Sequence, residues 1–312
     1  MGVLTFFKRN KTFYYIKNGF LDALPRSFFN KKLKHWIDYQ NKYPKKLIEE
    51  RVTYYINNKL PQKKIDGIQL KNFQKKGHKS MYYYDLMKYG RYFNQNLVVK
   101  LLFGDVDTNV ASPTFVKSRP INHNGNSVLL PLNKLRHFNF IDDTTPFSDK
   151  KDEIVWRGIT HKENRKLLVE KFKNRKGFNI LPIFLKDKNK TNFISIKEQL
   201  KYKFILSIEG NDVATNLKWI MSSNSLCFMP KPKFETWYME GKLRPNHHYV
   251  LIKDDYSDME EKMNFYSKNI EEAEKIIQNA KNWTLQFKDT KLEKVLSLLV
   301  MNSFFEQTQQ LK

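Results

Sequence analysis

The stretch Phe204-Ile-Leu-Ser-Ile208, followed at once by Glu209-Gly-Asn-Asp212, decides the fold. The first five residues are mostly apolar and predict a buried strand, whereas the next four are polar or turn-forming. A helix is expected to start at Thr215 and reach Met221, and Ser225-Leu-Cys-Phe-Met229 predicts the next strand. Strands that alternate with helices in this way predict an α/β fold with a parallel sheet and helices on both faces.

Upstream of this stretch, two further segments predict strands. Ile154-Val-Trp-Arg157 predicts a short strand and residues 164–176 a basic helix. Further back, Asn96-Leu-Val-Val-Lys-Leu-Leu-Phe103 predicts a strand by its β-branched and aromatic content. The polar stretch at residues 142–146 reads as a linker. We therefore expect two domains, residues 1–145 and 146–312.

Two helices are expected to close the chain. Ser257-Asp-Met-Glu260 has the pattern of a capping box, and apolar residues then recur at steps of three or four as far as Ala280. A second helix is expected from about Lys291 to Gln307, and this last helix can pack back on the N-terminal domain.

Charge is the strongest compositional signal. The 312 residues include 56 Lys and Arg but 32 Asp and Glu, which gives a formal net charge of +24. Such a chain is attracted to polyanions, namely nucleic acid, acidic lipid headgroups or phosphorylated glycolipid. Charge alone does not distinguish these three partners. The alternative explanation of the charge is a proteome that is rich in lysine.

The N-terminal segment and the cysteine content suggest a location. Residues 1–60 are basic and aromatic, which fits a segment facing anionic headgroups as well as it fits ordinary packing at a domain edge. No run of about 18 uncharged apolar residues exists, and basic residues from Lys8 onward interrupt any secretory signal. The only cysteine is Cys227, so an internal disulfide is impossible, which suits a reducing cytoplasm.

The first candidate site is Gly104-Asp-Val-Asp-Thr-Asn109, directly after a predicted strand. A calcium loop is rejected, because Val110 and Val116 stand where Gly and Glu are required. Three alternatives remain: a metal-binding carboxylate pair, a carboxylate that deprotonates a hydroxyl group, or an ordinary turn. Asp105 and Asp107 are the residues concerned.

The second candidate site runs from Trp156 through Arg157 and Gly158 to Arg165. A strand, a glycine turn and a helix start can cradle an anion, since backbone N–H groups and arginine side chains both bind phosphate. The alternative is a strand-to-helix turn with solvated basic residues.

The third candidate site lies at the end of the strand that opened this section. Small residues allow a ligand to approach the backbone, and polar residues gather at one helix start. The residues are Glu209, Gly210, Asn211, Asp212, Ala214 and Thr215. Because ligands collect at the carboxyl ends of parallel strands, this site and the second should share one edge of the sheet. A fourth candidate, Glu235 among aromatic residues, could hold a sugar ring; the adjacent His247 and His248 are an improbable metal site, since neighbours on a strand point apart.

Four quoted runs together carry a family resemblance. They are Trp156-Arg-Gly158, the run from Lys201 to Trp219, Met229-Pro-Lys-Pro-Lys-Phe-Glu-Thr-Trp-Tyr238, and His248-Tyr249. They resemble glycosyltransferase family 90, the capsule-associated-protein-type enzymes, over about residues 95–265. Val116-Lys-Ser-Arg-Pro120 and the Glu-Gly-Asn-Asp run look closest to bacterial lipopolysaccharide core glycosyltransferases of the LpsA type.

The resemblance implies a GT-B-like fold, in which two Rossmann-like domains face a central cleft and the C-terminal one holds the nucleotide. It implies a UDP-hexose donor, UDP-glucose or UDP-galactose, and no metal or other cofactor. Without a metal, basic side chains and a helix N-terminus must stabilise the departing diphosphate. Arg157 matches the family's strand-end Arg-Gly. Lys218 falls in the helix that carries a diphosphate-binding Arg in eukaryotic members, whose own position matches Asn216, so the exact ligand stays open.

The resemblance also assigns the acceptor side. Asp105 best matches the family's acceptor-side base, with Asp107 as runner-up, and Lys117 and Arg119 are expected to bind the acceptor. Glu235 matches an acidic residue before an aromatic pair and is expected to bind the donor sugar or ribose. A single in-line displacement would invert the donor's configuration, but the anomeric outcome is not assigned.

The expected partners are a nucleotide sugar and an anionic glycolipid acceptor such as the lipopolysaccharide core. The expected location is cytoplasmic, with peripheral contact to the inner face of the bacterial inner membrane. We expect no nucleic acid, since carboxylates in the binding groove would repel a phosphate backbone. A noncatalytic polyanion-binding protein remains the alternative. The choice of hexose, the linkage and the oligomeric state stay open.

Overall fold

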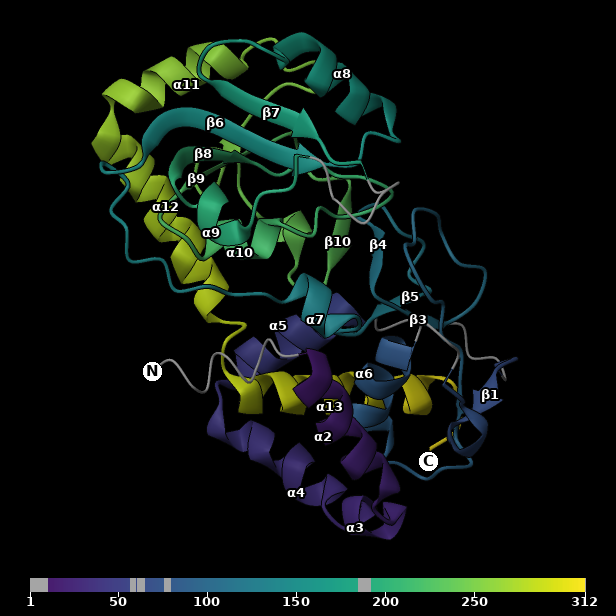
Figure 1. Ribbon diagram of the computed structural model, residues 1–312. Helices are drawn as coiled ribbons and strands as arrows, with labels where there is room; N and C mark the ends of the chain where they lie inside the picture. The colour runs from purple at the N-terminus through teal and green to yellow at the C-terminus, as the bar shows by residue number, and fades with distance from the viewer. Residues whose placement is uncertain (1–10, 57–59, 61–64, 76–79, 185–191, 312) are drawn as a thin grey trace. The chain divides into compact units, whose positions relative to one another are not determined.

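The computed structural model describes residues 11–56, 60, 65–75, 80–184 and 192–311 (Figure 1). The chain forms two compact units. Unit 1 comprises Met1–Asn139, Phe234–Met239 and Phe287–Lys312, and unit 2 comprises Phe140–Lys233 and Glu240–Gln286.

Unit 2 is built on a parallel sheet of five strands, which confirms the predicted α/β class. The strands, in chain order, are β6 (Lys151–Gly158), β7 (Phe178–Pro182), β8 (Tyr202–Leu206), β9 (Leu226–Met229) and β11 (Val250–Leu251). Their order across the sheet is β11-β9-β8-β6-β7, and every neighbouring pair is parallel. The chain therefore starts inside the sheet, adds β7 on one side, and then adds the remaining strands on the other.

Helices pack against this sheet because its strands are apolar on both faces. Ile154, Phe204 and Phe228 face a core shared with α8 (Glu163–Phe172), α11 (Met259–Lys268) and α12 (Ile270–Leu285). The intervening residues Val155 and Ile205 are equally buried on the opposite face. There, α9 (Ile196–Gln199) contacts β8 and α10 (Leu217–Met221) contacts β9 (Figure 1). Unit 2 also contains the short helix η4 (Glu240–Lys242).

The expected helix from Ser257 differs in two ways. It is two helices, α11 and α12, because Asn269 between them leaves the helical conformation at φ −109° and ψ 69°. The predicted capping box is wrong: the N-cap is Asp258, and no side-chain cap bond forms there. The capping box that the structure does contain is at Ser195 and Glu198, which start α9.

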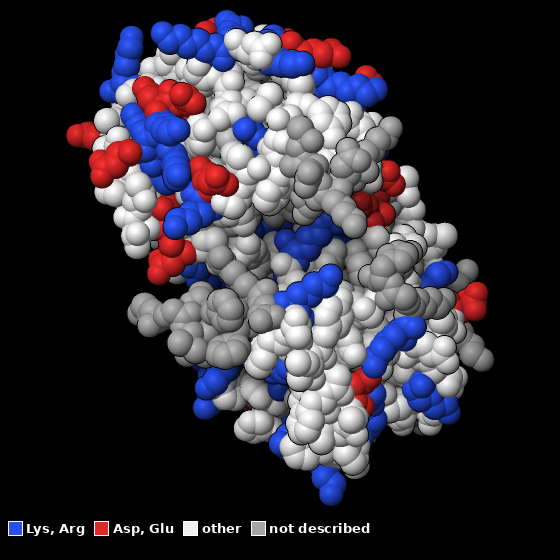
Figure 2. Space-filling model, in the orientation of Figure 1, with Lys and Arg blue, Asp and Glu red and all other residues white. Residues whose placement is uncertain are grey.

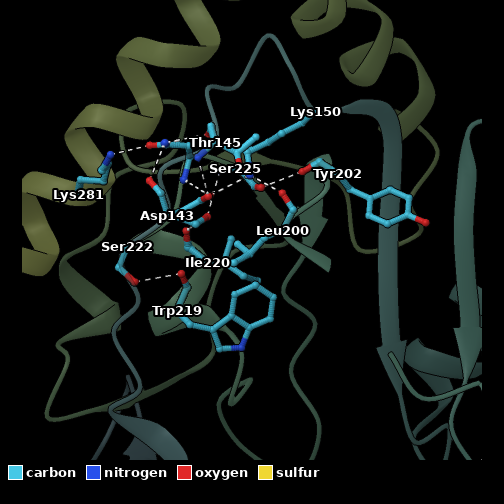
Figure 3. A network of polar contacts seen from close by, with 12 residues as sticks. Asp143, Thr145, Lys150, Leu200, Tyr202, Trp219, Ile220, Ser222, Ser225 and Lys281 are labelled. Carbon is cyan, nitrogen blue, oxygen red and sulfur yellow. Dashed lines mark hydrogen bonds and ion pairs between the residues drawn. The ribbon is translucent and has the colours of Figure 1, made fainter. Parts of the chain in front are cut away.

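The segment expected as a linker is held firmly on unit 2. Asp143 accepts an ion pair from Lys150 at 2.8 Å and a hydrogen bond from the backbone N–H of Asn224 at 2.9 Å (Figure 3). The Asn224 amide in turn donates to the carbonyls of Asp143 and Thr145. Lys150 and Asp143 are almost fully buried. The boundary therefore lies at residues 139/140 and not at the expected 145/146, because these contacts tie residues 140–145 to unit 2.

Unit 1 consists of helices and short strands drawn from three separate parts of the chain. Its helices are α2 (Lys11–Ala23), α3 (Arg26–Asn30), α4 (Leu33–Asp38), η1 (Tyr39–Lys42), α5 (Lys45–Tyr55), η2 (Leu70–Asn72), α6 (Ser80–Gly90), α7 (Lys134–His137) and α13 (Thr290–Gln307). Helix α13 matches the predicted last helix. It contacts α4, α5 and α6 and is buried along much of its length.

Within unit 1 the described residues form only two-stranded sheets. These pair β1 (Ile68–Gln69) with β2 (Val98–Val99), β3 (Thr114–Val116) with β5 (Ser127–Leu129), and β4 (Ser118–Pro120) with β10 (Phe234–Thr236). The expected second Rossmann-like sheet is therefore missing from this part of the chain. The strand predicted over residues 96–103 shrinks to β2 plus an isolated bridge from Leu101 to Phe115. Among the helices of the described ranges, none is both long and apolar enough to cross a bilayer.

Candidate functional site

The topology of unit 2 marks one place for a ligand. From β6 the chain runs outward to β7 and then returns to lay β8 on the other side of β6. In open parallel sheets a crevice forms at such a reversal, outside the carboxyl ends of the two strands. The loops that follow β6 and β8 are the second and third candidate sites of the sequence, so the structure brings these two together.

Arg165 joins the two loops. Its guanidinium group donates hydrogen bonds to three backbone carbonyls: Ile208 at 2.7 Å and Glu209 at 3.1 Å after β8, and Ile159 at 3.3 Å after β6. The same group lies over the ring of Trp156, with 5.8 Å from Cζ to the ring centroid. These bonds orient the arginine side chain between the two loops.

Glycine is needed at both strand ends. A Cβ added at Gly210 would lie 3.0 Å from Nη2 of Arg165, and one added at Gly158 would lie 2.5 Å from the ring of Trp156. Trp156 is buried in the core and cannot give way easily. Gly210 therefore allows Arg165 to lie flat against the loop, and Gly158 allows the β6 strand end to pass over the tryptophan.

The loop after β8 is fastened by its neighbours. The Glu209 carboxylate accepts hydrogen bonds from the backbone N–H of Lys233, at 3.2 Å to each oxygen. Asn211 contacts Nε2 of His161 at 2.9 Å, and Asn164 donates to the Glu209 carbonyl at 3.1 Å. These bonds connect the loops after β6, β8 and β9 at one edge of the sheet.

The rest of the third candidate site lies against this loop. The carbonyl of Asp212 accepts the N–H of Gly210 at 3.0 Å, and Asp212 is buried. Ala214 is also buried, and Thr215 is half-buried. The Asn216 side chain donates to the Leu206 carbonyl at 2.8 Å and contacts Ser207 Oγ at 3.2 Å, so it fixes the start of α10 to the end of β8.

Two basic residues expected at the diphosphate are used within the fold. Arg157 donates to the backbone carbonyls of Asn192, Trp156 and Asn179 and to the side-chain oxygen of Asn179. Burial lowers the pKa of its guanidinium group. Lys218 is fully buried and forms an ion pair with Glu240. The structure gives both side chains bonds inside unit 2, and donor binding by Arg157 and Lys218, as by Arg165, stays a prediction.

In unit 1 the first candidate site is a short ion pair. Asp105 accepts a 2.6 Å bond from Nζ of Lys117. Lys117 is buried, whereas the Asp105 side chain is 35% exposed. Asp107, two residues later, is exposed.

Arg119 and Glu235 pair with each other. They face across the β4–β10 ladder, and Nε of Arg119 lies 2.8 Å from Oε1 of Glu235. Both side chains are almost completely buried. Arg119 also donates to the carbonyls of Ser127 and Tyr54, and the Tyr54 hydroxyl donates to Glu235. This geometry is that of a structural pair in unit 1, and ligand binding by either residue stays a prediction.

Sequence reasoning missed three residues that shape the switch point. Asn164 and Tyr256 belong to one series of hydrogen bonds. The Tyr256 hydroxyl donates to the Asn164 carbonyl at 2.9 Å, and the Asn164 side chain donates to the loop after β8. Lys233 acts through its backbone N–H, which no side-chain pattern reveals. Asn164 could have been found, because it stands beside Arg165 in the segment already selected. In the described ranges, no three His, Cys, Asp or Glu side chains gather as metal ligands would.

Comparison with known proteins gives three findings. The model of the family described as glycosyl transferase family 90 matches residues 133–298. The O-glucosyltransferase LpsA of Dichelobacter nodosus is 42% identical over 306 residues, covering 95% of both chains. Protein O-glucosyltransferase 3 of Rattus norvegicus is 30% identical over 129 residues, which are 41% of this chain and 24% of the rat protein, and the human protein of that name is 29% identical over 137 residues.

Proposed function

The chain belongs to glycosyl transferase family 90 and is an LpsA-type hexosyltransferase, and from this premise we propose that it transfers glucose or galactose from a UDP-hexose to a lipopolysaccharide or lipooligosaccharide core. Both relatives are named O-glucosyltransferases, which favours glucose as the transferred hexose. The expected GT-B-like arrangement, with the donor's nucleotide on the C-terminal unit, is part of the same proposal.

The observation that carries the proposal is the bonding of Arg165. Its guanidinium group is held by three carbonyl oxygens at the point where the sheet of unit 2 reverses direction. We infer that this guanidinium group binds the diphosphate together with the start of α8, whose N-cap Lys162 makes no side-chain cap bond and whose N-terminal N–H groups would be turned toward it.

The same loops offer groups for the rest of the donor. Glu209 has a carboxylate oriented by the N–H of Lys233, and a carboxylate is a good acceptor for ribose or hexose hydroxyls. Gly210 leaves the backbone open to close approach. Asn211 supplies an exposed amide. Together these groups can orient the anomeric carbon while Arg165 and the helix N-terminus stabilise the leaving UDP.

In unit 1, Asp105 is the proposed base. It would accept the proton of the acceptor hydroxyl as the hydroxyl oxygen attacks the anomeric carbon and the bond to UDP breaks. Lys117 would orient the carboxylate through their ion pair. We propose that no metal takes part and that the displacement inverts the donor's configuration. We further propose peripheral binding to the inner face of the bacterial inner membrane, where the glycolipid acceptor is found.

A donor and acceptor screen tests the proposal. The protein is incubated with UDP-glucose or UDP-galactose and truncated core glycolipids, and the products are measured by mass spectrometry, with and without EDTA. We expect one hexose added to one core, unchanged by EDTA. If no UDP-hexose is transferred to any core, the proposed donor and acceptor are refuted. If transfer occurs only with an added metal, the proposed absence of a metal is refuted.

Substitution of Arg165 tests the binding site itself. Arg165→Lys keeps the charge but loses the planar fork, so UDP affinity should fall roughly tenfold or more. Arg175→Lys is the matched control, since Arg175 lies on the same unit in an exposed pair with Glu260. Equal UDP affinity in both variants would remove Arg165 from the site.

A further inference from the structure

Helix α2 is turned with its apolar side outward. Phe13, Ile16 and Phe20 lie three and four residues apart, hence on one face of the helix, and their side chains are 40%, 66% and 67% exposed. A helix with one side in water normally buries its apolar side chains and exposes its polar ones. In unit 2, α12 buries Ala273, Ile276, Ile277 and Ala280 and exposes its glutamates.

The polar side of α2 is fastened to the interior of unit 1, which fixes this orientation. The Tyr14 hydroxyl donates to the Asp85 carboxylate of α6 at 2.7 Å, and Asp22 accepts the Tyr83 hydroxyl at 2.8 Å. Asn18, between them, is buried. Turning the apolar residues inward would break these long-range bonds, so α2 is held with its apolar face toward the outside.

Basic side chains are frequent in this part of the chain. Residues 11–34 contain six of them, and the single carboxylate among these residues, Asp22, is paired with Arg26 at 2.8 Å; the six are Lys11, Lys17, Arg26, Lys31, Lys32 and Lys34. On the next helix Phe28 is half-exposed, with the Lys32 ammonium 3.8 Å from its ring centroid. Over the part of unit 1 where Figure 1 draws α2, Figure 2 shows mostly uncharged atoms, with Lys and Arg and also some Asp or Glu atoms beside them.

We propose that the exposed face of α2 inserts into an anionic lipid surface, with Phe13, Ile16 and Phe20 in the acyl boundary and the neighbouring lysines at the headgroups. Apolar side chains ringed by lysine are the combination that binds such a surface. A second copy of the chain fits this face poorly, since it would bring like charges of a +24 protein together. The inference rests on the proposed function only in that a glycolipid acceptor puts the enzyme at a membrane.

Vesicle binding tests the proposal. The full chain is sedimented with vesicles of phosphatidylglycerol and phosphatidylethanolamine, or of phosphatidylcholine alone. We expect binding to the anionic vesicles that weakens as salt is raised. The variant F13S/I16S/F20S should bind roughly 1,000-fold more weakly, at about tenfold per side chain. K11Q/K17Q should lose about fivefold per lysine.

Matched controls sit on unit 2. Phe265→Ser removes a side chain that is 50% exposed on α11, and K268Q/K275Q removes two exposed lysines; both should bind as the parent does. If these controls weaken vesicle binding as much as the α2 variants do, total charge or hydrophobicity determines the binding and the proposal is overturned. A change of the triple variant's mass in solution, without a change in vesicle binding, would assign the face to a second copy instead.

A label locates the inserted residue directly. Cys227 is the only cysteine and is buried, so Ile16→Cys can be labelled selectively with a polarity-sensitive dye. Its emission should shift to the blue with anionic vesicles, while the label on Phe265→Cys should not respond. Hexose transfer to a detergent-dispersed acceptor is measured in parallel. Loss of transfer with intact insertion would refute the proposed function alone, and transfer without insertion would refute this inference alone.

Discussion

Two buried arginines of unit 1 and the half-buried Arg165 of unit 2 differ in the partners that the structure shows for them. In unit 1, Arg119 pairs with Glu235 and Arg51 with Glu293, each at 2.8 Å and each almost fully buried. In unit 2, Arg165 is held by carbonyl oxygens. A buried carboxylate compensates the charge of its arginine, whereas the carbonyl oxygens orient the guanidinium group of Arg165 between two loops. We therefore assign a structural role to the two paired arginines of unit 1, and the binding role of Arg165 belongs to the proposed function.

The largest expected effect sharpens this comparison by assigning chemistry to unit 1. Asp105→Asn should lower kcat by roughly 1,000-fold, because an amide cannot accept the acceptor's proton. The binding of UDP, measured by calorimetry, should stay unchanged. Asp107→Asn is the paired control, two residues away and exposed. If Asp107→Asn is the inactive variant, the base is the runner-up.

The next effect could break the comparison. Glu235→Gln should destabilise the protein by about 3–5 kcal/mol, since it leaves Arg119 buried without its charged partner. Urea unfolding measures this loss. Glu49→Gln, in an exposed pair with Lys45, should change stability by less than about 0.5 kcal/mol. A stable Glu235→Gln variant with weakened donor binding would give Glu235 the ligand role that its family position suggested.

Smaller effects are expected from the two glycines of unit 2, and they should differ in kind. Gly158→Ala forces a contact with the buried Trp156 ring and should lower stability by about 1–3 kcal/mol. Gly210→Ala displaces Arg165 and should weaken UDP binding roughly tenfold with little change in stability. Calorimetry with UDP and thermal unfolding separate the two. Identical profiles for both variants would contradict the distinction between support and site.

The smallest effect concerns one histidine in each unit. Burial, with Arg119 nearby, lowers the pKa of His123 to about 4, and burial beside His247 and Arg244 lowers that of His248 to about 4. Both are neutral when folded, so the unfolded chain binds protons first as pH falls below about 6.5, and stability should decline from there to about pH 4. NMR titration of the two rings checks this; midpoints near 6.5 would contradict it.

The sequence predicted unit 2 far better than unit 1, for physical reasons. Strands such as Phe204-Ile-Leu-Ser-Ile208 are apolar on both faces and end in polar turns, and the local pattern suffices to place them and their loops on one sheet edge. In unit 1 the partner of β4 is β10, more than 100 residues later, and a pairing at that distance has no local signal. Consequently no local pattern showed that Glu235 pairs with Arg119, and the expected ligand role of Glu235 stays a prediction.

The same limit applied to the basic residues at the strand ends. Arg157 and Lys218 had the positions expected of diphosphate ligands, but only tertiary contacts show that their donors are used by Asn179 and Glu240. Arg165 had the same composition-level signal and proved to join two loops. Residue type and spacing selected one edge of the sheet as the expected site, and side-chain geometry was needed to show which groups each of its cations contacts.

The discontinuity of unit 1 has a consequence for synthesis on the ribosome. Unit 2 is complete once Gln286 has emerged, but the first unit still lacks α13, against which α4, α5 and α6 pack. The apolar faces of the early helices that pack on α13 therefore stay exposed until the last residues leave the exit tunnel. Nascent chains stalled at residue 286 should resist protease in the later segment and be cleaved in the earlier one, and they should need chaperones until release.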